Sequence, residues 1–418
     1  MSTLHEVQPG SSGIAAAEAA LRYNIRPLMT RAPESLRGAV LGLGAGAALA
    51  VESGAQAVAL EGLAAEQAPG LEQAARASGA RTVIGPDQRR AVLAGPPGCL
   101  AGVATRLVGE GPPLDDLGGA LAAALAGGRP RPSLICGDRS LRFGSRTLIM
   151  GVVNATPDSF SGDGLAGDVA AAVALAERLV AEGADLIDLG GESTRPGSDP
   201  VDAATELRRV MPLLEALAGR LAVPISVDTR KAEVARAAIA AGAGVVNDIW
   251  GLRGDPGMAP VLAAAPGVAL VAMHNRRGSP EGELLAEVGR GLRESLLIAA
   301  RHGIGADRVV VDPGFGFGKT PGQNLELVRR LGELDGIGRP LLLGASRKST
   351  IGLVLGGAPP EMRLEGTLAL CVLAVAAGAE IVRVHDVAEV RRGLRVADAV
   401  LREIPEAVRS ARAPGSTG

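Results

Sequence analysis

From about Arg146 onward the sequence repeats one pattern, and this repeat constrains the fold more than any other feature. A short apolar run, rich in leucine or β-branched residues, is followed by a polar loop and then by a stretch of Ala, Leu, Glu and Arg. Such runs are typical of parallel strands that are buried on both faces. Eight of them occur: TLIMGVV (147–153), DLIDLG (185–190), PISVD (224–228), GVVND (244–248), VALVAM (268–273), RVVVDPG (308–314), PLLLG (340–344) and EIVRVHD (380–386).

The size of the repeat favours a closed barrel. The eight units fill about 255 residues, roughly 32 each, which is the size of a (β/α)8 barrel. Helical stretches separate the runs, for example residues 166–184 and residues 231–243, and the second has apolar residues at helical spacing and ends at a glycine. We therefore predict an α/β protein whose main domain, residues 146–403, is a TIM barrel. An open, doubly wound sheet is the alternative.

The first 135 residues do not follow the repeat. The stretches 39–63 and 77–85 suggest a small N-terminal α/β domain, and residues 110–132 suggest a helix followed by a linker. We expect residues 136–145 to link this domain to the barrel and residues 404–418 to form a flexible tail. The glycine run at 42–46 resembles part of a phosphate-binding turn but lacks the full dinucleotide pattern, so close helix–strand packing explains it as well. We find no catalytic cluster in this domain.

Composition excludes several classes of function. The net charge is −2 and 47% of residues are hydrophobic, as in an ordinary soluble protein without affinity for nucleic acid. Three scattered cysteines form neither a disulfide framework nor a metal-binding spacing, which favours a reducing cytoplasm. The first 13 residues are polar, so we expect no signal peptide. Glu52, Gln56 and several glycines interrupt the apolar stretch 41–65, so we expect no membrane span and no membrane partner.

Polar residues follow all eight predicted strands. In a barrel these carboxyl ends meet at one rim, where the chemistry lies. Taken singly, an aspartate at a strand end often caps the next helix. For Asp228 this interpretation is as good as a role in a binding site, and for Asp248 it is the better of the two. Taken together, the eight ends predict a shared binding site. In strand order the residues are Asn154; Thr194, Arg195 and Pro196; Asp228; Asn247 and Asp248; His274 and Asn275; Asp312; Ser346, Arg347, Lys348 and Ser349; and Arg383, His385 and Asp386.

The residue types at this rim suit a flat, nitrogen-rich ring. Asp228, Asn247 and Asp312 offer carboxylates and an amide, and carboxylates accept paired N–H donors from guanidine-like edges such as those of aminopyrimidines or pterins. Lys348 supplies a donor for a carbonyl group or a ring nitrogen.

Other residues at the rim suit a phosphate or diphosphate. Arg383, His385 and, as a further candidate, Arg195 supply positive charge. Asn154 offers a neutral oxygen that suits a magnesium ion bridging phosphate oxygens. We find neither a Cys/His cluster for zinc nor a Ser-His-Asp arrangement for acyl transfer.

At these residues the sequence resembles the dihydropteroate synthases, folate-pathway enzymes of the pterin-binding TIM-barrel family. The resemblance covers about Arg146 to Glu403. It implies a transferase that joins 4-aminobenzoate to 6-hydroxymethyl-7,8-dihydropterin diphosphate, releasing diphosphate and forming 7,8-dihydropteroate. It also implies a homodimer formed through helices on the far side of the barrel. The motifs, in the family's order, are MGVVNATPDSFS, GADLIDLGGESTRPGS, ISVDTRK, VVNDI, DPGFGFGKT, GASRKS and IVRVHDV.

The resemblance implies a role for each matching residue. Lys348, Arg383, His385 and Arg195 are the catalytic candidates. The pterin is expected to bind Asp228, Asn247, Asp312 and Lys348, with Met273 packed against its ring. The diphosphate is expected to bind Asn154, Thr194, Arg383 and His385, with the Mg²⁺ cofactor at Asn154. The 4-aminobenzoate is expected to lie between Phe160, Pro196 and the stem of Lys348, with Ser349 at its carboxylate.

Two loops are expected to close over the site. The first contains Asp158, Ser159 and Phe160, and the second contains Thr194 to Pro196. Such lids exclude water and complete a site. In the mechanism that the resemblance implies, the bond from carbon to diphosphate breaks early, and the resulting pterin-stabilised cation is attacked by the amine without a strong general base.

The sequence departs from the family pattern at two loops. The first loop reads SFSGDG where SFSDGG is usual, and the segment after the fifth strand reads MHNRRGSP where MHMQG is common. The N-terminal 135 residues lie outside the resemblance and show no acidic metal-binding motif of the preceding pathway kinase.

Two alternatives share parts of this pattern. A pterin-binding methyltetrahydrofolate methyltransferase has the same barrel and the Asp/Asn/Asp pocket, but does not need NATPDSFS, STRPG and SRKS together with RVHD. A non-catalytic pterin-binding paralogue is expected to lose loop or anion-binding residues, and none is lost here.

Overall fold

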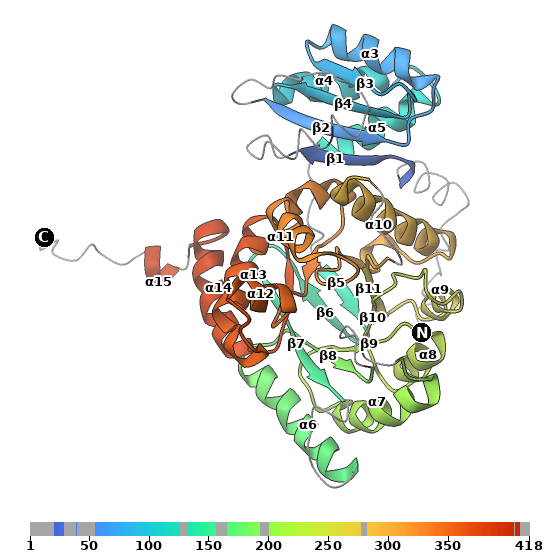
Figure 1. Cartoon of the computed structure of the whole chain (residues 1–418). Coiled ribbons are helices and arrows are strands. Elements are labelled where there is room, and N and C mark those ends of the chain that lie inside the picture. Colours follow the sequence, from blue (N-terminus) through green and yellow to red (C-terminus); the bar gives the residue numbers. More distant parts are fainter. Residues whose placement is uncertain are drawn as a thin grey trace, which may run out of the picture.

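The computed structural model of the chain consists of a small N-terminal domain and a larger barrel domain that lie against each other (Figure 1). It describes residues 21–28, 39, 55–125, 133–155, 165–192, 200–276, 282–404 and 406–409. The statements below refer to these residues.

The larger domain is the predicted TIM barrel. Its eight strands pair in parallel in the order β12-β11-β10-β9-β8-β7-β14-β13, and a parallel bridge between Val311 and Leu341 joins the last strand to the first. The sheet is therefore closed, and the open doubly wound alternative does not apply. The strands are β7 (Leu148–Asn154), β8 (Leu186–Gly190), β9 (Ile225–Asp228), β10 (Val245–Asp248), β11 (Ala269–Met273), β12 (Val309–Asp312), β13 (Leu342–Leu343) and β14 (Ile381–Val384).

Helices surround the barrel and cover its strands (Figure 1). Local capping fixes where some begin: Asp202 accepts a hydrogen bond from the backbone N–H of Thr205 at the start of α7, and Thr320 and Gln323 form a capping box at the start of α11. The helices are α6 (Leu165–Ala181), α7 (Ala203–Leu217), α8 (Ala232–Ala240), α9 (Met258–Ala263), α10 (Leu284–Arg301), α11 (Pro321–Arg329), α12 (Ser349–Val354), α13 (Leu364–Ala376), α14 (Val387–Leu401) and α15 (Glu406–Arg409), with 3-10 turns η2 (Ala306–Arg308), η3 (Leu331–Ile337) and η4 (Pro360–Met362).

A hairpin closes the amino-terminal end of the barrel. Its strands are β5 (Ser133–Cys136) and β6 (Arg139–Arg142), which pair in antiparallel fashion. Leu134, Cys136 and Leu141 form one buried cluster with residues at or near the starts of barrel strands, among them Leu148 and Leu186. The interval 136–145, expected to be a linker, therefore includes part of a packed hairpin that fills the end of the barrel opposite the strand ends.

The described residues of the N-terminal domain form one sheet and the helices α3 (Gln67–Ala77), α4 (Pro97–Leu107) and α5 (Leu114–Leu125). Its strands β1 (Asn24–Leu28), β2 (Gln56–Glu61), β3 (Arg81–Ile84) and β4 (Arg90–Gly95) pair in the order β1-β2-β4-β3, always antiparallel. Alternate residues of β2 face different sides: Val58 and Leu60 pack with helices α3, α4 and α5, whereas Ala57 and Ala59 belong to a second cluster. The glycine run at 42–46 lies outside the described residues.

Among the helices of the described part of the chain, we find none with the length and hydropathy of a membrane span.

Candidate active site

Strand register places the predicted site residues at one end of the barrel. Asn154 of β7 pairs with Gly190 of β8, Gly190 with Asp228 of β9, and Asp228 with Asn247 of β10. On the next strands Met273 pairs with Asp312. Because the strands are parallel, these side chains share the carboxyl-terminal rim, as the sequence predicts.

Arg383 connects several of these residues. Its Nε donates to Asp188 Oδ2 at 2.6 Å and its Nη2 donates to Asp228 Oδ2 at 3.0 Å. Asp188 also accepts hydrogen bonds from Ser226 Oγ at 2.6 Å and from Asn247 Nδ2 at 3.0 Å. One network therefore joins a predicted diphosphate ligand, Arg383, to two predicted pterin ligands.

Asp188 is a site residue that the sequence analysis missed. It is fully buried in the middle of β8, and burial of an unpaired carboxylate is strongly unfavourable. The available signal was the acidic residue within the otherwise apolar run DLIDLG. Its partner Arg383 lies 195 residues further along the chain, so the pairing itself could not be read from local sequence.

Burial moves the pKa values of three predicted pterin ligands toward neutral pH. It raises the pKa of Asp228 to about 7, supported by Asp188 and opposed by Arg383. It raises the pKa of Asp312 to about 6, although the N–H of Gly314 donates to Oδ1 at 2.7 Å. It lowers the pKa of Lys348 to about 8, with Arg383 acting in the same direction and Asp312 against it. Such opposed shifts are typical of functional sites.

Lys348 is held in place by the loop that follows β12. It is the N-cap residue of α12, and its Nζ lies 4.1 Å from the ring centroid of Phe317, a cation–π distance. Gly316 has a φ of +80°, and a Cβ there would lie 3.2 Å from Lys348 Cδ. The glycines of DPGFGFGK thus permit both the turn and the close approach of Lys348.

His385 is neutral in this environment. Burial lowers the pKa of His385 to about 3, and Arg383 and Arg347 act in the same direction, so these surroundings favour a neutral imidazole, and the predicted role of His385 at a diphosphate stays a prediction. Ser346 Oγ lies 3.0 Å from His385 Nδ1 and accepts the backbone N–H of His385 at 3.2 Å. This arrangement lets the hydroxyl donate to Nδ1, which leaves Nε2–H as the free donor.

Arg347 stabilises the turn before Lys348. Its φ is +57°, which is unfavourable for a non-glycine residue. Its Nε donates to Asp386 Oδ2 at 3.0 Å, its backbone N–H donates to Thr367 Oγ1 at 3.1 Å, and its carbonyl accepts a bond from Arg363. Arg347 and Asp386 therefore hold the seventh and eighth strand ends together.

Two strand-end residues have structural partners. Asp248 accepts hydrogen bonds from the backbone N–H groups of Trp250 and Leu252. It therefore caps a turn, which is similar to the helix-capping role that the sequence favours for it. His274 is buried, and its Nδ1 lies 3.3 Å from Lys319 Nζ. Asp228 caps no helix, because the N-cap of α8 is Lys231.

Six predicted residues lie outside the described part of the chain. They are Asp158, Ser159 and Phe160 of the first loop and Thr194, Arg195 and Pro196 of the second loop. Ser349 is the first residue of α12, directly after Lys348.

The described residues contain no group of three or more His, Cys, Asp or Glu side chains suited to a metal ion. Asn154, half-buried at the end of β7, is the neutral oxygen ligand that the sequence predicts for magnesium. Mg²⁺ commonly keeps several waters and binds through few protein ligands plus substrate phosphates. The donor set therefore fits a magnesium ion that is held mainly by the diphosphate.

Comparison with known proteins agrees with this geometry. Residues 150–385 match the family model described as pterin binding enzyme. A dihydropteroate synthase of Bacillus subtilis is 45% identical over 264 residues, which are 63% of this chain and 92% of that protein.

Solved structures give the same result. The dihydropteroate synthase of Xanthomonas albilineans with 4-aminobenzoic acid superimposes with a TM-score of 0.61 at 46% identity, over 64% of this chain and 98% of that one. A complex from the same organism with 7,8-dihydropteroate gives a TM-score of 0.59 at 42% identity, over 65% and 98%. About a third of this chain thus has no counterpart in these relatives.

Proposed function

Because the chain belongs to the family of pterin binding enzymes, as a dihydropteroate synthase, we propose how its residues bind the substrates of that reaction. The enzyme is a transferase of folate biosynthesis that joins 4-aminobenzoate to 6-hydroxymethyl-7,8-dihydropterin diphosphate and releases diphosphate. The network that joins Arg383 to Asp188, Asp228 and Asn247 carries the residue assignment, because it puts groups for a pterin and for an anion in one buried site.

The pterin lies on the network of β8, β9 and β10. Asp228 and Asp312 accept hydrogen bonds from the amino and ring N–H groups of the pterin, and Asn247 contributes its amide. Lys348 donates to the ring carbonyl or a ring nitrogen. Met273 packs against the ring face, which its buried position at the end of β11 supports.

The diphosphate binds on the opposite side of Arg383 from the carboxylates. Arg383 supplies the positive charge and His385 supplies an N–H donor, with Asn154 and Thr194 as further ligands. When bound there, Mg²⁺ neutralises part of the charge of the diphosphate. The diphosphate would be a third anionic partner of Arg383, beside Asp188 and Asp228. Asp188 keeps its place in this arrangement, because Ser226 and Asn247 both donate hydrogen bonds to it.

The 4-aminobenzoate binds between the aliphatic stem of Lys348 and the two loops. Phe160 and Pro196 flank its ring and Ser349 meets its carboxylate. As the carbon–oxygen bond to the diphosphate breaks, Arg383, His385 and Arg195 stabilise the departing negative charge, and the amine attacks the cationic carbon. The chain needs no strong general base for this step.

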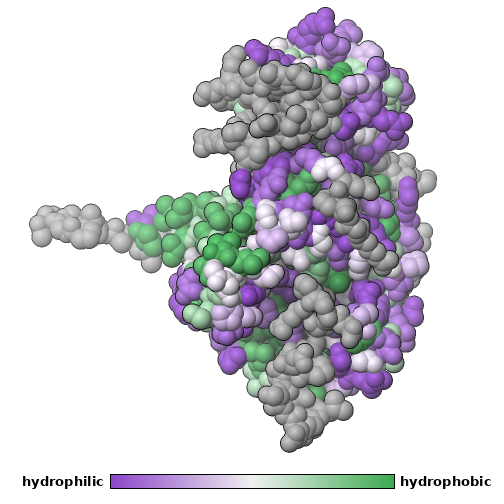
Figure 2. Space-filling view, viewed as in Figure 1, coloured by the Kyte–Doolittle hydropathy of each residue, from purple (hydrophilic) through white to green (hydrophobic). Residues whose placement is uncertain are grey.

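We also propose that the enzyme is a cytoplasmic homodimer. Exposed apolar side chains gather on α12, η4, α13 and α14, the green area in Figure 2. Apolar areas of this kind mark contact surfaces more often than free ones. The residues are Leu353, Val354, Met362, Leu373, Val396 and Val400.

The test is a direct assay of the full chain. Purified protein is incubated with Mg²⁺, 4-aminobenzoate and the pterin diphosphate, and 7,8-dihydropteroate is measured by mass spectrometry, with each component omitted in turn. We expect product only in the complete mixture. Pterin binding without product would support the non-catalytic alternative. Methyl transfer from methyltetrahydrofolate to a corrinoid would support the methyltransferase alternative.

A further inference from the structure

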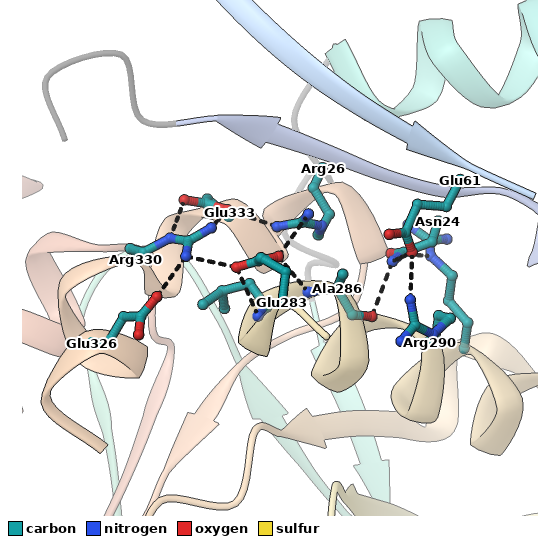
Figure 3. A network of polar contacts seen from close by, with 11 residues as sticks. Asn24, Arg26, Glu61, Glu283, Ala286, Arg290, Glu326, Arg330 and Glu333 are labelled. Carbon is teal, nitrogen blue, oxygen red and sulfur yellow. Dashed lines mark hydrogen bonds and ion pairs between the residues drawn. The ribbon is translucent and has the colours of Figure 1, made fainter. Parts of the chain in front are cut away.

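The N-terminal domain contacts the barrel through its edge strand β1 (Figure 3). Arg26 of β1 is only 2% exposed and lies between two glutamates of the barrel. Its Nη2 is 2.9 Å from Glu283 Oε2 and its Nη1 is 2.8 Å from Glu333 Oε2. A buried charge pair that loses one partner is strongly destabilised, so Arg26 is an integral part of this interface.

A barrel arginine, Arg330, belongs to the same cluster. Arg330 is 1% exposed and bonds Glu283 and Glu326 at 2.6 Å and Glu333 at 2.7 Å. Arg26 and Arg330 thus lie among Glu283, Glu326 and Glu333 (Figure 3). Loss of Arg26 would leave Glu283 and Glu333 in the cluster without one of their cationic partners.

Hydrogen bonds of Asn24 and two close backbone approaches also join the two domains. Asn24 of β1 donates to Ala286 O at 3.2 Å and accepts a bond from Arg293 Nε at 3.3 Å. Gly289 of α10 permits this approach, because a Cβ there would lie 2.6 Å from Asn24 Oδ1. Gly336 of η3 does the same for the carbonyl of Ile25, which would lie 2.4 Å from a Cβ. A side chain at position 336 would displace the backbone of β1, whereas one at position 289 would displace the side chain of Asn24.

On the barrel, Arg26 and Asn24 of β1 bind Glu283 and Ala286, which lie at the start of α10. Glu283 is the N-cap residue of α10, and its carboxylate accepts the backbone N–H groups of Leu285 at 3.2 Å and Ala286 at 2.9 Å. Arg26 and Asn24 therefore bind both the cap and the first turn of the helix that follows β11.

From this turn, contacts continue to the pterin site. Glu287 of α10 accepts two hydrogen bonds from Arg276, at 3.0 and 2.8 Å. Arg276, which lies in the segment MHNRRGSP, also donates to Gln323 and to the carbonyl of Gly318. Gly318 follows Phe317, whose ring lies against Lys348.

We propose that the N-terminal domain positions the pterin site, with Arg26 as a positioning residue that acts through the first turn of α10. The contacts with β1 hold this turn in place, and the turn holds Arg276 through Glu287. Arg276 in turn binds the loop after β12, whose Phe317 lies against Lys348. Coupling between distant sites can be carried by packed side chains and hydrogen-bond networks, and the contacts named above form such a connected set. The inference rests on the proposed function of the barrel.

The experiment compares full-length Arg26→Gln with wild type in steady-state kinetics, at a temperature where both are folded. We expect the KM for the pterin diphosphate to rise roughly five- to tenfold, with a smaller change for 4-aminobenzoate, and Arg26→Lys to restore part of the loss. Arg290→Ala is the matched control. Arg290 bonds Glu61 at 3.1 Å across the same interface, but it is 50% exposed and lies outside the first turn of α10.

A second variant covers the case in which Arg26→Gln does not fold. Asn24→Ala removes the bond to Ala286 O and keeps the ion cluster, and we expect the same selective rise in KM. A pterin KM within about twofold of wild type in the folded variants, whether or not the melting temperature falls, would overturn the inference and leave the proposed function intact. An inactive wild-type chain would instead overturn the proposed function.

Discussion

At the scale of single residues, the site depends on side chains whose charge state is set by burial. Asp228 and Asp312 are acids with raised pKa values and Lys348 is a base with a lowered pKa. In the proposed function, a pterin would give these groups hydrogen bonds that replace those lost on leaving water. The burial of these groups therefore supports a polar ring as the ligand.

Removing one such partner is expected to abolish most of the turnover. For Lys348→Ala and Asp312→Ala we expect kcat/KM to fall by about 100-fold or more, as for loss of a buried donor in an active site, while circular dichroism shows a folded protein. Glu233→Ala, at an exposed residue of α8, is the control. Near-normal turnover of either site variant would refute the assignment.

Pterin binding is expected to depend on pH with a maximum between about 7 and 8. The carboxylates must lose their protons to accept N–H bonds, so affinity rises as pH passes the pKa of Asp312 at about 6 and of Asp228 at about 7. Lys348 must keep its proton to donate, so affinity falls above its pKa at about 8. Calorimetric titration of a pterin from pH 5 to 9 tests this, and Asp312→Asn should weaken the acidic limb. A constant affinity over this range would contradict it.

At the scale of elements, the loops above the barrel and the hairpin below it have separate tasks. The loops carry the residues proposed to bind substrates, whereas the β5–β6 hairpin fills the opposite end with apolar side chains. This division is usual for TIM barrels, where one face serves chemistry and the other serves stability.

The first loop, through Phe160, is expected to contribute more to the binding of 4-aminobenzoate than to the binding of the pterin diphosphate. Phe160→Ala removes a wall of the 4-aminobenzoate site, so the KM for 4-aminobenzoate should rise far more than the dissociation constant for the pterin diphosphate. Steady-state kinetics and calorimetry measure the two quantities. Equal weakening of both would count against the proposed role of Phe160.

The hairpin is expected to stabilise the barrel without affecting its chemistry. Leu134→Ala leaves a cavity among buried residues and should lower the free energy of unfolding by about 2–5 kcal/mol, measured by urea denaturation. Ile135 of the same strand is 49% exposed, so Ile135→Ala should change stability by only about 0.5 kcal/mol. Equal effects of the two substitutions would show that the hairpin does not pack as described.

At the scale of the whole molecule, two surfaces of the barrel differ in whether the N-terminal domain covers them. One, formed by α10 and η3, is covered by the N-terminal domain of the same chain. The other, the apolar area on α12 to α14, is exposed in the single chain. The N-terminal domain therefore leaves the proposed dimer surface free.

A charge on the second surface is expected to separate the dimer. Val396 is 67% exposed on α14, and Val396→Glu should shift the molecular mass in solution from that of a dimer to that of a monomer, because an unpaired charge would be buried at the interface. Light scattering after size-exclusion chromatography measures this. Val108→Glu, at an exposed valine of the N-terminal domain, should have no effect. A wild-type monomer would refute the proposed dimer.

The sequence by itself determined the barrel and most of its rim. Each strand is a local apolar run followed by its own polar residues, so all eight strands and the sharing of one rim by Asp228, Asn247, Asp312, Lys348 and Arg383 could be predicted without knowing any long-range contact. The motifs and their order along the chain also identified the family. Both inferences depend on residues that are near one another along the chain.

Only the tertiary structure decided which side chains pair and which keep their charge. Arg383 meets Asp188 across 195 residues, and Arg26 meets Glu333 across 307 residues. The neutral state of His385 follows from burial among groups of other strands. The packing of a hairpin in the interval expected to be a linker follows from apolar residues at the far end of the barrel. Burial and charge pairing arise from groups that the fold brings together, so no local pattern in the sequence encodes them.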